Sequence, residues 1–166
     1  RYLLTVGRLE EYKGVQHVIR AMTTLPEYDL LIAGSGSYQE QLEQIASDEG
    51  VAAQVEFLDY VDDEALPGLY AGAEVYVTMS EFEAYGMTVA EALAAGTPCV
   101  VRDEAALQDW TQNQGVVGVS SIAPESIQQA VQSTNSTGDS MLQDRSWEAV
   151  TTQIDQAAYS KEVSAI

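Results

Sequence analysis

Short apolar runs alternate along this chain with longer segments in which apolar residues recur at helical spacing. The runs predict strands, and the segments that follow them predict helices. Strands are expected at residues 2–7, 28–34, 55–58, 74–79 and 99–101, and helices at residues 14–25, 37–50, 63–73, 87–96 and 103–112. A chain in which each strand is followed by a helix forms a parallel sheet covered on both faces.

The carboxyl-terminal part extends this pattern. Residues 116–119 form another apolar run and predict a sixth strand, while residues 124–133 and 145–162 have helical patterns. The polar residues 134–140 between these helices predict a flexible turn. We therefore expect an α/β fold, a Rossmann-like parallel sheet of about six strands with helices on both faces, in a single domain over residues 1–166.

The composition is strongly acidic. The 166 residues include 26 Asp and Glu against 7 Lys and Arg, and the formal net charge of −19 is spread along the whole sequence. Repulsion from phosphate groups argues against nucleic acid and anionic membrane surfaces as partners. A diffuse excess of carboxylates keeps a surface hydrated in molar salt, which favours a halophilic source.

Several features bear on the location of the protein. No apolar stretch approaches the roughly 20 residues that span a bilayer, and the first residues lack the pattern of a signal peptide. The single cysteine, Cys99, cannot form an internal disulfide and is expected to be a buried thiol. We expect a cytoplasmic protein. Because Arg1 already lies in a strand-like run, we also expect this chain to be a piece of a longer protein.

Ligands of open parallel sheets bind beyond the carboxyl ends of the strands, so the loops at that edge are the candidate sites. The first is GRLEEYKG, residues 7–14, in which Arg8 and Lys13 lie five positions apart. In so acidic a chain this pair predicts an anion site, since charge-assisted contacts to phosphate contribute roughly 1.5 to 3 kcal/mol each. The alternative is a solvated turn in which Lys13 pairs with Glu10 or Glu11.

The second loop is AGSGSYQEQL, residues 33–42. Gly34 and Gly36 allow a tight turn that could expose backbone amides at a helix start. A dinucleotide fingerprint would place a third glycine where Gln39 stands. The spacing therefore argues against NAD, and a plain turn remains the alternative.

The third loop, SEFEAYGMTVAEALAAGTP at residues 80–98, has two glutamates eight positions apart, Glu83 and Glu91. Gly86 precedes a helix whose first amides, at Met87 and Thr88, would offer partial positive charge to an anion. Carboxylates accept hydrogen bonds from neighbouring hydroxyls, which suits sugar rings. The alternative is a pair of capping boxes, since each glutamate stands three residues after a Ser or Thr.

Taken together, the three loops resemble the carboxyl-terminal domain of the family 4 retaining glycosyltransferases of the GT-B fold. VGRLEEYKG is similar to that family's GR-L-x-x-x-K-G segment, IAGSG to its glycine turn, and EAYGMTVAEALAAGTPCVV to its E-x7-E signature. The resemblance extends from residue 1 to about residue 101, and a terminal helix around residues 147–154 is also similar. It implies a nucleotide-sugar donor-binding domain, one half of a GT-B fold, whose amino-terminal acceptor domain is absent from this chain.

The resemblance also implies roles for individual residues. Arg8 and Lys13 would bind the donor diphosphate, Glu83 would hold hydroxyls of the transferred sugar, and these three would be the catalytic groups. Glu91 would hold the ribose. The further donor-binding positions implied are Gly7, Gly34, Gly36, Gly86, Met87 and Thr88, with Phe57 and Leu58 bordering the base.

The implied reaction needs no metal or cofactor from this domain, because Arg8 and Lys13 would stabilise the charge on the leaving diphosphate. His17 lies in the first predicted helix, where a structural role is expected. The chain alone is expected to bind the donor but to transfer no sugar, and any contact with the inner face of a membrane would belong to the acceptor domain. Two alternatives remain: a non-catalytic nucleotide-sugar-binding module and a GT-B-like epimerase.

Overall fold

The computed structural model describes residues 1–134, and the predictions made for residues 135–166 lie outside that range. Six parallel strands form one sheet in the order β3-β2-β1-β4-β5-β6. The strands are β1 (Tyr2–Val6), β2 (Asp29–Ala33), β3 (Val55–Phe57), β4 (Val75–Thr78), β5 (Cys99–Arg102) and β6 (Val116–Val119). The expected Rossmann-like fold is confirmed, including its sixth strand.

Alternate residues of the strands pack on opposite faces of the sheet. Leu3 of β1 and Val100 of β5 are buried in one core cluster, while their neighbours Leu4 and Val101 are buried in the other. Cys99 belongs to the second cluster and is a buried free thiol, as expected. Both faces of the sheet are therefore apolar, which is why the strands read as continuous apolar runs.

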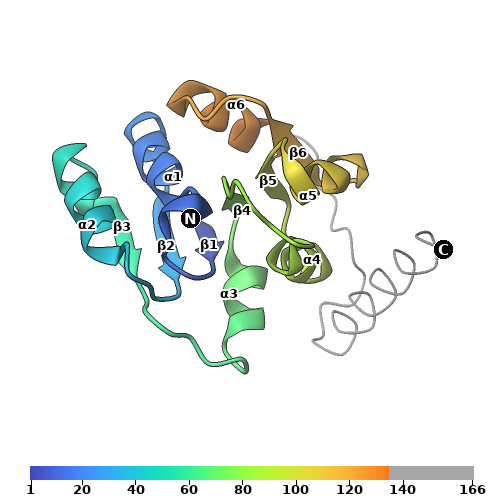
Figure 1. Ribbon diagram of the computed structural model, residues 1–166, viewed down its shortest axis with the longest axis horizontal. Coiled ribbons are helices and arrows are strands. Elements are labelled where there is room, and N and C mark those ends of the chain that lie inside the picture. The colour runs from blue at the N-terminus through green and yellow to red at the C-terminus, as the bar shows by residue number, and fades with distance from the viewer. Residues whose placement is uncertain (135–166) are drawn as a thin grey trace.

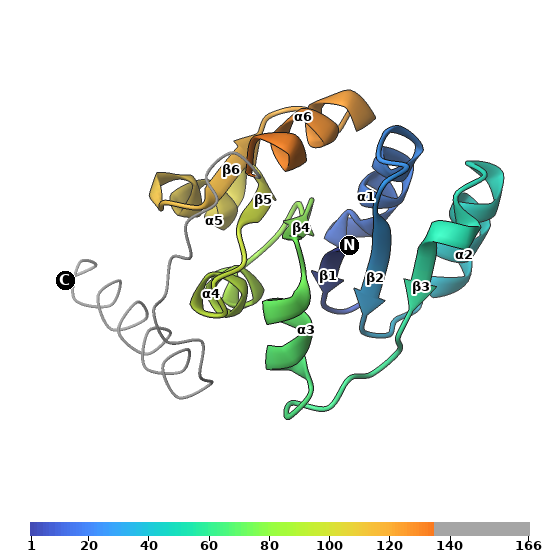
Figure 2. The ribbon, with the colours of Figure 1, turned by 180° about the vertical axis from the view of Figure 1, so that it is seen from behind.

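The helices divide between these two faces (Figures 1 and 2). One face is covered by α1 (Val15–Ala21), α2 (Gln39–Asp48) and α6 (Pro124–Thr134), and the other by α3 (Leu66–Gly72), α4 (Met87–Ala94) and the short α5 (Ala105–Gln108). Four 3-10 turns complete the described part: η1 (Glu11–Lys13), η2 (Met22–Thr24), η3 (Ala52–Gln54) and η4 (Asp109–Gln112). No helix among residues 1–134 is both long and apolar enough to cross a membrane.

One helix differs from its prediction. The pattern at residues 103–112 predicts a single helix, whereas the chain forms α5 and η4. Ala105, at the start of α5, has a φ of 51°, in the left-handed region that only Gly adopts without cost. The helix therefore begins two residues later than predicted, and its second half continues as the 3-10 turn η4.

The strand order places a switch point between β1 and β4. From β1 the chain proceeds outward through β2 and β3, then returns to the other side of β1 to begin β4. The loops that leave β1 and β4 lie next to each other at the carboxyl edge, where the Glu81 amide donates a hydrogen bond of 2.8 Å to the Tyr12 carbonyl. Such a switch point is where doubly wound sheets bind their ligands.

Candidate functional site

An ion pair joins the two loops of the switch point. Lys13 ends η1, in the loop after β1, and Glu83 lies in the loop between β4 and α4. Lys13 Nζ lies 2.6 Å from Glu83 Oε1, and the side chains are only 19% and 18% exposed. The predicted alternative, in which Lys13 pairs with Glu10 or Glu11, is wrong.

Arg8 lies beside this pair. Its Nη2 donates a hydrogen bond of 3.0 Å to the hydroxyl of Tyr12. The ring of Tyr12 in turn lies 5.4 Å from Lys13 Nζ, close enough for a cation–π contact. The two cations of the loop are therefore held side by side by one aromatic residue between them in the sequence.

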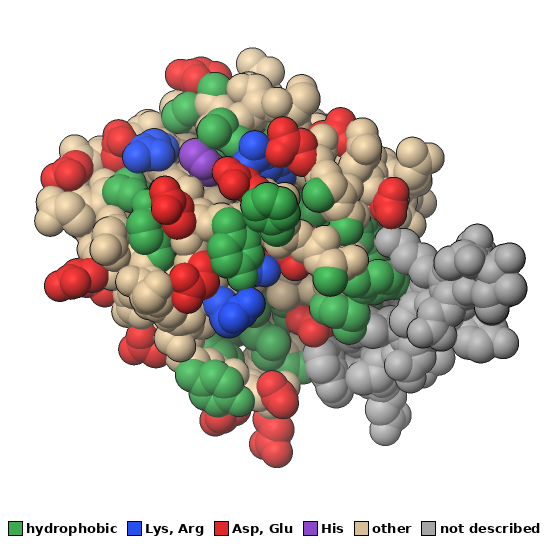
Figure 3. Space-filling model, in the orientation of Figure 1, with side chains coloured by type: hydrophobic (Ala, Val, Ile, Leu, Met, Phe, Trp, Pro, Cys, Tyr) green, Lys and Arg blue, Asp and Glu red, His purple; other side chains and the backbone are tan. Residues whose placement is uncertain are grey.

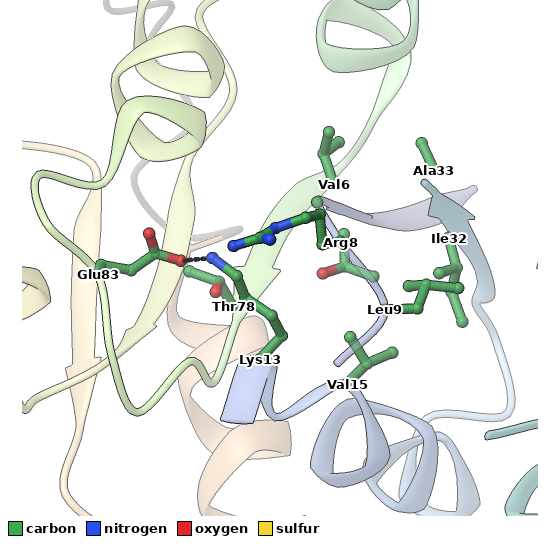
Figure 4. A pocket seen from close by; sticks show the side chains of 11 residues that line it. Val6, Arg8, Leu9, Lys13, Val15, Ile32, Ala33, Thr78 and Glu83 are labelled. Atoms are coloured by element: carbon green, nitrogen blue, oxygen red, sulfur yellow. Dashed lines mark hydrogen bonds and ion pairs between the residues drawn. The ribbon is translucent and has the colours of Figure 1, made fainter. Parts of the chain in front are cut away.

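These side chains converge on a narrow pocket at the ends of β1, β2 and β4 (Figure 4). Arg8 and Lys13 point toward Glu83 across its opening, and Thr78 lies beneath them. The pocket holds about 10 Å³, room for about one water molecule. The structure thus brings together all three residues that the sequence analysis named as catalytic.

A wider pocket of about 290 Å³ begins on the other side of Arg8. It is bordered by the loop after β1, the loop after β2 and the segment between β3 and α3. Its lining residues are Val6, Gly7, Arg8, Ala33, Gly34, Ser35, Tyr60, Val61, Asp63 and Leu66. Arg8 and Gly7 border both pockets, so the opening of the narrow pocket adjoins the wider one.

Gly86 sets the start of α4. It is the N-cap residue, with φ at 87° in the left-handed region, and no side chain caps the helix. The Met87 and Thr88 amides belong to a first turn whose N–H groups have no intrahelical acceptor. The capping-box alternative is wrong, because Ser80 donates to the Phe82 carbonyl and Thr88 accepts from the Tyr76 hydroxyl.

Glu91 lies on α4 against α3. Its Oε2 accepts a hydrogen bond of 2.7 Å from the hydroxyl of Tyr70, whose side chain is fully buried. Burial raises the pKa of Glu91, the Tyr70 hydrogen bond lowers it, and the negative charge of Asp63 raises it. Since Asp63 lines the wider pocket, Glu91 lies within electrostatic reach of that pocket.

Backbone contacts determine the conformation of the glycine turn after β2, and only Gly34 of its two glycines borders a pocket. Gly34 has a φ of 135°, and a Cβ there would collide with the Gly7 carbonyl. Its amide donates to the Asp59 carbonyl at 2.7 Å and is not directed at the pocket. Gly36 packs against the backbone of Leu9 and does not line either pocket.

Phe57 and Leu58 also lie away from the two pockets. Phe57 packs against the core cluster under α2, and the Leu58 amide donates to the Ile32 carbonyl. The residues that border the wider pocket at this edge come slightly later, at Tyr60 and Val61. Their signal in the sequence was an apolar pair in an otherwise acidic stretch, residues 59–64.

The charge on the surface is uneven. Acidic side chains are scattered over the face shown in Figure 3, whereas a few Lys and Arg side chains lie near its centre beside hydrophobic ones. Among residues 1–134, no cluster of His, Cys, Asp and Glu side chains could hold a metal ion. Arg8 and Lys13 therefore place positive charge at the switch point of an acidic molecule.

The fold and the site together define a class of protein: a doubly wound α/β domain with two cationic side chains and a carboxylate at its switch point. The family follows from comparison. A family model described as glycosyl transferases group 1 matches residues 1–140, and the chain belongs to this family.

Curated relatives share this region. The chain is 40% identical over 117 residues to an uncharacterized glycosyltransferase of Methanocaldococcus jannaschii, an alignment covering 69% of this chain and 30% of the relative. It is 29% identical over 164 residues to the O-antigen chain mannosyltransferase B of Escherichia coli, covering 91% and 39%. A glycogen synthase of Mycobacterium tuberculosis is 37% identical over 129 residues, covering 75% and 31%. The chain thus spans about a third of the length of these relatives.

Solved structures share this fold over about half of their own length. HepE of Anabaena, in complex with UDP and glucose, superposes with a TM-score of 0.78 at 18% identity, covering 97% of this chain and 48% of that one. Sucrose-phosphate synthase of Thermosynechococcus elongatus gives a TM-score of 0.78 at 24% identity, covering 99% and 46%. At these identities the likeness establishes the fold alone.

Proposed function

We propose that the chain is the nucleotide-sugar-binding domain of a retaining glycosyltransferase of family 4, which transfers a hexose from a nucleoside-diphosphate donor. The observation that carries the proposal is the meeting of Arg8, Lys13 and Glu83 at the switch point. Two cations in an acidic protein suit a diphosphate, and a carboxylate beside them suits sugar hydroxyls. Membership of the group 1 family and the UDP of the HepE complex support the same assignment.

The donor would lie across the opening of the narrow pocket and extend into the wider one. The diphosphate would lie between the Arg8–Lys13 pair and the amides of Met87 and Thr88, because the start of α4 offers partial positive charge. The ribose would lie against Glu91. The base would enter the wider pocket, where Tyr60 offers an exposed ring for stacking.

The reaction breaks the bond between the anomeric carbon and the diphosphate oxygen, and forms a bond from that carbon to an acceptor hydroxyl. In the retaining course, the acceptor attacks on the face from which the diphosphate leaves, and its proton passes to a phosphate oxygen. Arg8 and Lys13 would stabilise the charge that develops on the diphosphate, and Glu83 would hold the sugar. We propose that this domain needs no metal for the step.

The acceptor would be bound by an amino-terminal domain covalently attached to this one. The relatives are more than twice as long as the region they share with this chain, and a cleft between two domains would enclose the transferred sugar. The names of the relatives include both a glycogen synthase and an O-antigen mannosyltransferase. A cytoplasmic location would give the domain access to its nucleotide-sugar donor.

Calorimetry with UDP, GDP and ADP tests the proposal. We expect one of them to bind, and Arg8→Ala or Lys13→Ala to weaken that binding by about tenfold or more, as the loss of a charge-assisted contact requires. Arg20→Ala is the matched control, because Arg20 pairs with Glu49 away from both pockets. The proposal fails if no nucleoside diphosphate binds, or if all three variants bind like the parent chain.

A further inference from the structure

A third opening lies beside the Lys13–Glu83 pair and is not used by the proposed donor. It holds about 480 Å³ and is lined by Tyr12, Phe82, Glu83, Ala84 and Ala105. This volume is within the range of small-molecule sites, roughly 300–1,000 Å³. Glu83 is the one lining residue that it shares with the narrow pocket. A molecule bound here would therefore lie next to the carboxylate proposed to hold the transferred sugar.

The aromatic wall of this opening consists of Tyr12 and Phe82, and contacts with Arg8 and Lys13 hold Tyr12 in place. Tyr12 and Phe82 pack edge to face with their ring centroids 6.4 Å apart. The hydroxyl of Tyr12 accepts a hydrogen bond from Arg8, and its ring faces Lys13 Nζ. Phe82 nevertheless remains 69% exposed. A large apolar ring is thus presented to solvent at a fixed position, one residue from Glu83.

The chemistry of the walls limits what can bind. Two rings and two alanine methyl groups offer apolar contact, and Glu83 offers a hydrogen-bond acceptor. The neighbouring acidic side chains, Glu81 and Glu104, share Arg102. The two cations beside Tyr12, Arg8 and Lys13, would be taken by the donor diphosphate. With the donor bound, an anionic molecule would therefore be repelled. A neutral molecule with one apolar face and several hydroxyls fits best, and a pyranose ring has both.

We propose that the Tyr12–Phe82 wall binds the acceptor, and that the acceptor presents a neutral sugar ring to it. This inference rests on the proposed function, because it places a second substrate next to the donor. The ring would stack its C–H face on Phe82 and direct a hydroxyl toward the donor at Glu83. Phe82 is then a positioning and specificity residue contributed by the donor domain to acceptor binding.

NMR titration of the labelled chain with methyl α-D-glucopyranoside and methyl α-D-mannopyranoside tests the inference. The chain is first saturated with whichever of UDP-glucose, GDP-mannose or ADP-glucose binds it. We expect one glycoside to shift the methyl signals of Ala84 and Ala105, and Phe82→Ala to weaken its binding by about threefold to tenfold, the usual contribution of an aromatic contact. Ile122→Ala is the control, because Ile122 is an exposed apolar side chain that lines none of the three pockets.

Four results would overturn the inference. They are no shift of either alanine up to the solubility of the glycosides, unchanged affinity in Phe82→Ala, equal binding of glucose 6-phosphate, and competition between glycoside and nucleotide-sugar. The last result would mean that the opening belongs to the donor sugar. Failure of the proposed function is separate, because it appears in calorimetry as absent nucleotide binding, and the glycosides can then be titrated into the free chain.

Discussion

At the scale of single residues, Lys13 and Glu83 neutralise each other before any ligand arrives. Their 2.6 Å contact is mostly shielded from water, and a partly buried pair interacts more strongly than one in bulk solvent. A diphosphate that binds Lys13 must compete with Glu83 for it. The same competition releases the Glu83 carboxylate for sugar hydroxyls, so diphosphate and sugar should favour each other's binding.

This competition predicts opposite effects of one substitution on two ligands. Glu83→Gln keeps the shape of the side chain but removes the charge that holds Lys13. The bare nucleoside diphosphate should bind about twofold to tenfold more tightly. The affinity for the nucleotide-sugar should not rise in the same way, because a neutral amide replaces the charged carboxylate that accepts hydrogen bonds from the sugar hydroxyls. Calorimetry with both ligands measures the two affinities.

Glu81→Gln is the matched control for this experiment. Glu81 lies in the same loop and carries the same charge, but it pairs with Arg102 and lines neither donor pocket. It should change neither affinity. If Glu83→Gln affected both ligands equally, Glu83 would not distinguish sugar from diphosphate, and its proposed role would be lost.

The buried position of Glu91 is expected to lower the stability of the fold at pH 7, while its carboxylate is proposed to bind the ribose. Burial raises its pKa, so the folded chain holds this proton more tightly than the unfolded chain does. The group therefore stabilises the fold fully below its ordinary pKa of 4.5, and this contribution is lost as the pH rises through the raised value. At pH 7 the buried charge opposes folding.

Glu91→Gln should accordingly raise the Tm at pH 7, and the gain should shrink as the pH is lowered toward 5. The amide oxygen can still accept from Tyr70, so the packing is kept. The same variant should weaken nucleoside diphosphate binding if Glu91 holds the ribose. Glu40→Gln on the exposed surface of α2 controls for the loss of one charge, and a lower Tm for Glu91→Gln at pH 7 would contradict the argument.

The sequence was enough to name the three charged residues of the narrow pocket, but not their partners. Arg8, Lys13 and Glu83 are identified by residue type and by their place after strands. The contacts Lys13–Glu83 and Tyr70–Glu91 join positions 70 and 21 residues apart, and only the strand order brings them together. Tyr12 and Phe82 were missed because a single aromatic residue in a loop belongs to no periodic pattern.

At the scale of elements, the loop before α4 is supported from behind by η4. Trp110 Nε1 donates a hydrogen bond of 2.6 Å to the Tyr85 carbonyl, and the two rings pack edge to face at 5.5 Å. Gly86 lies directly against this ring, where a Cβ would approach Trp110 Nε1 to 2.9 Å. The position of Glu83 and the start of α4 therefore depend on a short element that follows β5.

Gly86→Ala tests this dependence. The substitution adds backbone strain at a positive φ of 87° and crowds Trp110, and we expect it to destabilise the fold by about 2 to 4 kcal/mol. Gly50→Ala is the matched control, because Gly50 has a similar φ of 73° with nothing near its Cβ position. It should cost only the strain, about 1 to 2 kcal/mol. Chemical denaturation gives both values, and equal losses would show that contact with Trp110 does not matter.

The elements themselves were largely predictable. Each of the six strands begins or ends within a residue or two of its apolar run, because a strand covered on both faces must be apolar throughout. The conformation of the segment after β5 could not be predicted from the sequence, because it depends on contacts with residues far away in the chain. η4 brings Trp110 to the carbonyl of Tyr85, 25 residues away. Ala105 adopts a left-handed φ, which cannot be predicted from the presence of an alanine.

At the scale of the whole molecule, the few basic side chains are mostly neutralised by neighbouring glutamates. Among residues 1–134, four of the five basic side chains are held in ion pairs with glutamates, those of Arg1, Lys13, Arg20 and Arg102. A net charge of −19 on 166 residues then destabilises the compact state through self-repulsion.

This repulsion predicts that salt stabilises the fold. The Debye length falls from about 10 Å at 0.1 M to about 3 Å at 1 M, so KCl should screen neighbouring carboxylates and raise the Tm by about 5 °C or more. Most of the rise should come below about 1 M, where the screening length changes most. Sucrose at matched osmolality controls for general exclusion from the protein surface.

A charge-reduced variant separates repulsion from every other effect of salt. Glu27, Glu40, Glu56 and Glu64 are exposed and form no ion pair within the described residues. Replacing all four with Gln removes charge without disturbing packing, so the Tm in dilute buffer should rise and its dependence on KCl should flatten. If the variant keeps the full salt dependence of the parent chain, or if the parent's Tm does not change between 0.1 and about 2 M KCl, carboxylate repulsion does not limit the stability. In that case the acidic composition would not support the halophilic source expected from the sequence.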